Sequence, residues 1–171
     1  GHGDEQDQLL PKKIEAFAGQ RAVAVSAGET HNLAILPMAP LELGLGGFGQ
    51  LGHGAEQNEL LPTTVEAFAG QRVVAVSAGD DHSLAITADG ASWSWGAGHN
   101  GELGHGDEQH RWQPTKVEAL AGQRGGAVFA QSHDSVALTA DGAAWSGGRG
   151  AFGRLGHGDE QQQLLPKKIE A

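Results

Sequence analysis

Leu-Gly-His-Gly occupies residues 51–54, 103–106 and 155–158, and the chain opens with a shortened form of the same element, Gly-His-Gly at residues 1–3. The full copies stand 52 residues apart, and a common phrase surrounds each of them. A fixed period of this length indicates one supersecondary unit in tandem, in which each copy buries its apolar face against the next. The 171 residues are therefore expected to form one repeat domain. Its units are 1–51, 52–103, 104–155 and a partial repeat 156–171.

The second repeat shows the unit most clearly, because short apolar segments alternate there with glycine and Asp-Gly turns. This pattern predicts four short antiparallel strands, the content of one β-propeller blade. The expected strands are 64–68, 73–77, 82–87 and 91–95. We therefore predict an all-β fold: a partial (incomplete) β-propeller with about three four-stranded antiparallel blades and the start of a fourth. A β-solenoid is the less favoured alternative, because its rungs are usually shorter and lack hairpins.

Four segments of this repeat carry a family resemblance: Val-Val-Ala-Val-Ser-Ala-Gly at 73–79, His-Ser-Leu-Ala-Ile-Thr-Ala-Asp-Gly at 82–90, Trp-Ser-Trp-Gly at 93–96 and Gly-Glu-Leu-Gly-His-Gly at 101–106. The string resembles the repeat of the regulator-of-chromosome-condensation family and recurs three times. The resemblance implies a seven-bladed propeller. Members of the family include a nucleotide-exchange factor for a small GTPase, propeller domains of large ubiquitin ligases and a plant UV-B photoreceptor. Because one fold serves such different functions, the resemblance does not by itself select one.

The third repeat departs furthest from the common pattern. Gly125 and Gly126 replace a Val-Val pair, Gln131 replaces Gly79, and Gly147 replaces Trp95. Glycine weakens a strand, and a side chain at a left-handed glycine position costs strain. We therefore expect the third blade to be the least regular.

The two ends of the chain carry nearly the same sequence, since residues 156–171 repeat residues 1–16. They are expected to compete for one position in a ring instead of completing each other. Three units cannot close a seven-bladed ring, so we expect a fragment of a longer protein, an open arc, or an assembly of copies. Open blade edges favour self-association.

Composition excludes several classes of function. The formal net charge is −10 and the 11 Lys and Arg residues are scattered, which disfavours direct nucleic-acid binding. No apolar run approaches the length of a membrane span. The absence of Cys excludes disulfides, thiolate zinc sites and cysteine nucleophiles. It favours a cytoplasmic or nuclear location over secretion.

One histidine recurs in every unit and is followed by a carboxylate, which are residue types that bind metals. The series is His2, His53, His105 and His157. Equivalent loops of neighbouring blades usually lie too far apart to share one ion. We therefore expect these histidines to hydrogen-bond backbone in Gly-His-Gly turns, and we predict no metal site and no cofactor.

A second pair, His31 and His82, precedes the third strand of its repeat, and Asp81 and Ser77 lie near His82 in sequence. A hydrolase triad is disfavoured, because near neighbours in one strand–turn–strand segment rarely reach that geometry. We expect each histidine to tie the strand entry to its own blade. No catalytic residue is predicted, and the strand residues Trp93, Trp95 and Trp145 are expected to be core.

The predicted function is a non-enzymatic protein–protein interaction scaffold. Its binding rim is expected in loops 29–31, 80–82 and 131–134, whose acidic character suits a basic patch on a protein partner. Trp112 beside Arg111 has the composition of an interaction hot spot, although it could instead fill the niche of Leu60. The candidate rim residues are Glu29, His31, Asp80, Asp81, His82, His133, Asp134, Arg111 and Trp112.

Two alternatives follow from the resemblance. One is guanine-nucleotide exchange on a small GTPase, which in that family needs a wedge-like insertion that no repeat shows. The other is a substrate-recruiting segment of a ubiquitin ligase, in which a client of the ubiquitin pathway is the partner.

Overall fold

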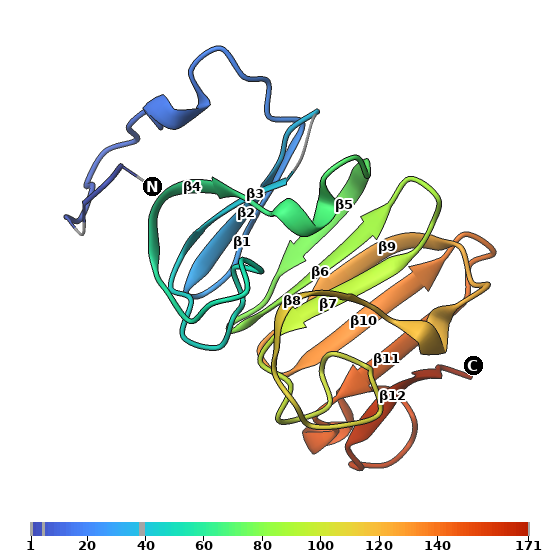
Figure 1. The fold of residues 1–171 in the computed structure, drawn as a ribbon. Helices are drawn as coiled ribbons and strands as arrows, with labels where there is room; N and C mark the ends of the chain where they lie inside the picture. The colour runs from blue at the N-terminus through green and yellow to red at the C-terminus, as the bar shows by residue number, and fades with distance from the viewer. Residues whose placement is uncertain (1, 5, 38–39, 171) are drawn as a thin grey trace.

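The computed structural model describes residues 2–4, 6–37 and 40–170, and these form three four-stranded antiparallel sheets (Figure 1). The first sheet is β1 (Ala24–Ala27), β2 (His31–Ile35), β3 (Pro40–Gly44) and β4 (Glu59–Thr64). The second is β5 (Val73–Ala78), β6 (His82–Thr87), β7 (Ser92–Gly96) and β8 (Arg111–Lys116). The third is β9 (Gly125–Ala130), β10 (Asp134–Thr139), β11 (Ala144–Gly148) and β12 (Gln163–Lys168).

Within each sheet the strands pair in chain order, as in a propeller blade. The three sheets stand side by side, and the first strand of the second blade, β5, contacts both β1 and β9 (Figure 1). Two short 3-10 turns connect the blades, η2 (Glu66–Phe68) and η3 (Glu118–Leu120). A third, η1 (Glu15–Phe17), precedes β1, and a fourth, η4 (Ala151–Gly153), lies between β11 and β12 of the third blade. The predicted three-bladed, all-β architecture is confirmed. Over the described ranges, no helix has the length and apolar character needed to cross a membrane.

The outer strand of each blade comes from the following repeat, so one expected strand was misplaced. Residues 64–68 were predicted to open the second blade, but residues 59–64 form β4 at the outer edge of the first. Pro62 is tolerated there because an outer strand has one unpaired edge. The next residues turn into η2, which buries Phe68 completely. Burial of this ring between blades overrides the strand-like alternation.

The two similar chain ends adopt different structures. Residues 163–168 form β12 and complete the third blade, instead of starting a fourth as expected. The matching residues 8–13 form no strand. The difference is one of context, because β11 offers its edge to residues 163–168, whereas no strand of the described sheets pairs with residues 8–13.

The third blade is as regular as the second, so the expectation that it would be the least regular is wrong. Its strands have six, six, five and six residues, the same lengths as those of the second blade. The shortest strand is the four-residue β1 of the first blade. Gln131 carries no strain, because its counterpart Gly79 does not adopt a left-handed backbone.

The main core lies between the first and second blades. Trp95 is fully buried, and Phe68 meets Trp93 and Trp95 edge-on at 5.5 and 5.7 Å between ring centroids. The cluster comprises Leu33, Ile35, Val65, Phe68, Val73, Ala78, Ala85 and Trp95. A smaller cluster of Leu84, Ile86 and Val128 joins the second and third blades. Each repeat therefore buries its apolar face on the next, as the period predicts.

Candidate functional site

The three predicted rim loops lie next to one another in space. They connect the first and second strands of successive blades, and backbone hydrogen bonds cross between them. The Glu29 N–H donates to the Gly79 carbonyl at 3.3 Å, and the Asp80 N–H donates to the Gln131 carbonyl at 3.3 Å. Loops 51 residues apart in sequence thus form one continuous edge of the arc.

His31 is buried at this edge and reaches across to the next blade. Its Nε2 lies 2.8 Å from Oγ of Ser83, and the Ser83 hydroxyl donates to the Gln50 carbonyl at 3.0 Å. Because the serine proton is committed to that carbonyl, Nε2 of His31 carries a proton and donates it to Oγ. The imidazole is neutral, since burial lowers its pKa to about 4.

His82 repeats this arrangement at the next junction. Its Nε2 lies 2.9 Å from Oγ of Ser135, which donates to the Glu102 carbonyl at 2.8 Å. Burial lowers the pKa of His82 to about 3. The two histidines were predicted to tie strand entries within their own blades, but they tie each blade to the following one.

The residues considered for a triad do not come together. Ser77 lies in an inner strand, where its Oγ accepts the Ala130 N–H at 2.9 Å. Ser83 contacts His31, but it is fully buried and its hydroxyl is committed to a carbonyl. The hydroxyl of Ser135 is likewise committed to a carbonyl, so these serine–histidine contacts hold blades together.

The histidines of the Gly-His-Gly turns also have structural partners. His105 Nε2 lies 3.0 Å from Oγ of Ser94, and His157 Nε2 lies 2.9 Å from Oγ of Ser146. The structural role was predicted, but the partner is a serine hydroxyl and not backbone. Each serine in turn donates to a main-chain carbonyl at 2.7 Å, that of Leu103 or of Leu155.

The first blade breaks this pattern, because Glu42 stands where the other blades have serine. Both Glu42 oxygens and Nε2 of His53 are buried without a hydrogen-bond partner among the described residues. Burial raises the pKa of the Glu42 carboxyl well above its usual range. The Trp95 ring N–H lowers the pKa of this carboxyl, but by less than burial raises it. The N–H itself donates its hydrogen bond to the Gln50 carbonyl at 2.9 Å.

Asp134 occupies the position of His31 and His82 in the third blade. It is buried, and its Oδ1 pairs with Nη1 of Arg154 at 3.2 Å. His31, His82 and Asp134 therefore point into the fold, whereas Glu29 is exposed and Asp80, Asp81 and His133 are half-buried.

Arg111 and Trp112 lie at the same edge as loop 80–82. In the second blade Arg111 pairs with Gly96, which pairs with His82. Arg111 Nη2 contacts Oδ2 of Asp107 at 2.7 Å. Trp112 is 49% exposed, and it packs so closely on Gly49 that a Cβ there would lie 2.4 Å from Cδ1 of the indole.

Sequence reasoning missed further members of this edge. Phe48 and His110 have ring centroids 5.4 Å apart, and His99 lies 5.8 Å from both His110 and His133. We call this set the rim cluster. It consists of Phe48, His99, His110, Arg111, Trp112 and His133.

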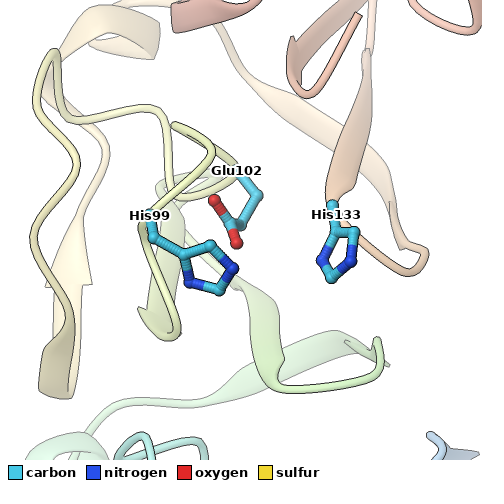
Figure 2. A group of neighbouring side chains, drawn as sticks. All are labelled: His99, Glu102 and His133. Atoms are coloured by element: carbon cyan, nitrogen blue, oxygen red, sulfur yellow. The ribbon is translucent and has the colours of Figure 1, made fainter. Parts of the chain in front are cut away.

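One group in this region has the composition of a metal site. His99, Glu102 and His133 offer ligand atoms that all lie within 4.8 Å of one another (Figure 2). The signal that could have found the group is a comparison of repeats. The corresponding positions at the first junction hold Gly47, Gln50 and Asp81.

Comparison with known families confirms the resemblance. The chain matches the regulator of chromosome condensation (RCC1) repeat over residues 1–35, 43–86, 89–134 and 141–171. It is 35% identical to the ultraviolet-B receptor UVR8 of Arabidopsis thaliana, over 100% of this chain and 39% of UVR8. It is 39% identical to the human E3 ubiquitin-protein ligase HERC2, over 99% of this chain and 4% of HERC2.

Solved structures show the same fold. Prp20p from Saccharomyces cerevisiae, a protein studied for its binding to Gsp1p and histones, superposes with a TM-score of 0.79 at 26% identity, over 88% of this chain and 38% of Prp20p. Human WBSCR16 superposes with a TM-score of 0.80 at 28% identity, over 88% of this chain and 40% of that protein. The chain thus spans less than half the length of each of these proteins.

Proposed function

Because this chain belongs to the regulator of chromosome condensation (RCC1) repeat family, we propose that it is a non-enzymatic scaffold that binds a protein partner through the rim cluster. The observation that carries the proposal is the pair Arg111 and Trp112. Both are fixed by their surroundings, and Trp112 stays half-exposed. Tryptophan and arginine are the residue types most enriched in interface hot spots.

The pair is preorganised, which lowers the entropy lost on binding. The Trp112 carbonyl accepts the Gly54 N–H at 2.8 Å, and its ring rests on the backbone of Gly49. Arg111 is held by Asp107 in a contact of 2.7 Å. A shallow hollow lined by Gly54, His110, Arg111, Trp112 and Thr115 adjoins them. A partner can therefore dock without first ordering these side chains.

The charge of the chain points to a basic partner. The net charge is −10, and the adjoining loops contribute Glu29, Asp80 and Asp81. Such a field accelerates encounter with a positively charged surface and disfavours acidic ones. Histones are basic, and Prp20p has been studied for its binding to them and to Gsp1p. These proteins define the probes for a first test.

The test compares binding of purified histones, and separately of a Gsp1p-type small GTPase, to the full chain and to Trp112→Leu. Leucine occupies the same position at residues 9, 60 and 164, so the fold accepts it. We expect Trp112→Leu to weaken binding roughly 30-fold, the effect of losing one hot spot. The matched control is Leu60→Ala, the same position in the preceding blade.

Two results would contradict the proposal. If wild type and Trp112→Leu bind a probe with equal affinity, the rim cluster is not the binding surface. If neither probe binds, the partner is not a basic protein or small GTPase of these kinds.

Guanine-nucleotide exchange is the second candidate, favoured by the structural similarity to Prp20p. Its readout is accelerated release of labelled GDP from the GTPase, which binding alone does not produce. Recruitment of substrate for a ubiquitin ligase is the third candidate, favoured by the similarity to HERC2. It requires a ligase domain in the same full-length protein, which the sequence of the gene reveals.

A further inference from the structure

We propose that His99, Glu102 and His133 bind one divalent transition-metal ion of the Zn²⁺ class and thereby clamp the second blade to the third. His99 and Glu102 belong to the loop that follows β7, and His133 belongs to the loop between β9 and β10. Figure 2 shows the three side chains turned toward a common space between these two loops. The site shares His99 and His133 with the rim cluster, but metal binding does not require the partner proposed above.

The geometry is close to that of a bound ion. All three ligand atoms lie within 4.8 Å of one another. Zinc binds imidazole nitrogen and carboxylate oxygen at about 2.0–2.2 Å, which places tetrahedral ligand atoms roughly 3.4 Å apart. His99 is exposed and His133 is half-buried, so rotation of their side chains can close the difference. Two imidazoles and one carboxylate leave a fourth position for water, as in many zinc sites with three protein ligands.

Glu102 is a buried acidic residue whose two carboxyl oxygens accept hydrogen bonds from Asn100, Oε2 from the N–H at 2.7 Å and Oε1 from Nδ2 at 3.4 Å. Its side chain is only 2% exposed, and no Lys or Arg of the described segments forms an ion pair with it. Buried charges in proteins are normally paired or coordinate a metal. Glu102 is also held in position, because Oε2 accepts the Asn100 N–H at 2.7 Å and its own carbonyl accepts the Ser135 hydroxyl. Such outer hydrogen bonds orient metal ligands.

The junction between the first and second blades is an internal reference. There Gln50 replaces Glu102 and donates from Nε2 to Oδ1 of Asp81 at 3.4 Å. Asp81 stands at the position of His133, and Gly47 stands at that of His99. The first and second blades therefore pack together without three metal-binding side chains at these positions. At the second junction all three positions carry metal-binding side chains, which the packing of the blades does not require.

His110 lies close to the site but has another role. Its Nδ1 accepts the Gly98 N–H at 3.1 Å, as Asn58 Oδ1 accepts the Gly46 N–H at 3.0 Å in the preceding blade. His110→Asn preserves this hydrogen bond and removes one imidazole from the rim cluster. It is therefore a matched control for loss of a histidine that is not a ligand.

The experiment uses the full chain without an affinity tag, stripped of metal by a chelator. Zn²⁺ is titrated by calorimetry, Co²⁺ is followed by its visible absorption, and thermal unfolding is recorded with and without Zn²⁺. We expect one ion per chain, a Co²⁺ spectrum typical of a tetrahedral site, and a higher unfolding temperature with Zn²⁺. Glu102→Gln, His133→Asp and His99→Gly introduce the residues of the first junction, and each is expected to weaken Zn²⁺ binding more than 100-fold.

His110→Asn is expected to bind Zn²⁺ within threefold of the wild type. The proposal is overturned if the stripped chain does not bind Zn²⁺ at 100 µM, or if Glu102→Gln and His99→Gly bind it as tightly as the wild type. Loss of binding in His110→Asn equal to that in the ligand variants would overturn the assignment of the three ligands. These readouts need no protein partner, so they stand or fall separately from the proposed function.

Discussion

Nε2 of His31 in the first blade lies 2.8 Å from Oγ of Ser83 in the second, and this contact is repeated at 2.9 Å between His82 and Ser135. In both cases the serine hydroxyl donates a hydrogen bond to a main-chain carbonyl, that of Gln50 or of Glu102. At each of the two junctions, therefore, two hydrogen bonds meet at one serine and join it to a histidine and a carbonyl of the preceding blade.

Removal of a serine from this chain should destabilise the fold. Ser83→Ala leaves the buried His31 donor unpaired, which is expected to lower the free energy of unfolding by about 1–3 kcal/mol. Ser135→Ala should have a similar effect at the second junction. Urea unfolding followed by tryptophan fluorescence measures both. Ser132→Ala, in the same rim region, is the control and should change stability by less than about 0.5 kcal/mol.

Acidification should destabilise the chain before the carboxylates titrate. The folded pKa values of His31 and His82, about 4 and 3, lie below the value near 6.5 of an unfolded chain. Below pH 6.5 these two histidines therefore bind protons in the unfolded state but not in the folded state, so the free energy of unfolding falls as pH falls. Between pH 7 and 5.5 each histidine should contribute a loss on the order of 1 kcal/mol.

The measurement is the urea midpoint as a function of pH for the wild type and for His82→Gln. Glutamine does not titrate in this range, so the variant should show a shallower slope between pH 7 and 5.5. An unchanged slope would show that His82 binds its proton as readily in the folded state as in the unfolded state, and would contradict the lowered pKa.

Glu42 should cost stability at neutral pH. Because its folded pKa is raised, the folded state keeps a proton that the unfolded state loses above about pH 4.5, so stability falls as pH rises through that range. Glu42→Gln keeps the volume and removes the charge. We expect a gain of about 1–2 kcal/mol at pH 7.5 and a smaller gain at pH 4.5. The exposed Glu66→Gln is the control, and an equal gain there would refute a burial effect.

Gly79 should be intolerant of any side chain, for a reason unrelated to its own backbone angles. A Cβ at this position would lie 2.3 Å from the Gln131 carbonyl oxygen of the next blade. The junction must then open, which should cost about 1–3 kcal/mol for Gly79→Ala. Gly47→Ala meets nothing within 4 Å and serves as the control. Thermal unfolding compares the two, and similar melting temperatures would contradict the close approach of the blades.

The local hydrophobic pattern predicted most strands correctly, but it misplaced the outer strand of the blade. Residues 73–77 and 82–87 were predicted as strands and lie in β5 and β6, because alternation and Asp-Gly turns are local signals. The outer strand was placed at 64–68 instead of 59–64, because the choice depends on whether Phe68 is buried between blades. That burial is set by the neighbouring repeat and not by the segment itself.

The sequence by itself determined that this chain is a tandem array of four-stranded units of the regulator of chromosome condensation type, because period, turn residues and apolar alternation are all local or repeated signals. Only the tertiary structure decided the roles of the histidines, because the partners lie one repeat away: His31 and His82 become ties between blades. It also brought His99, Glu102 and His133 together from two repeats. Packing of adjacent blades, which no single segment encodes, is the physical cause of both.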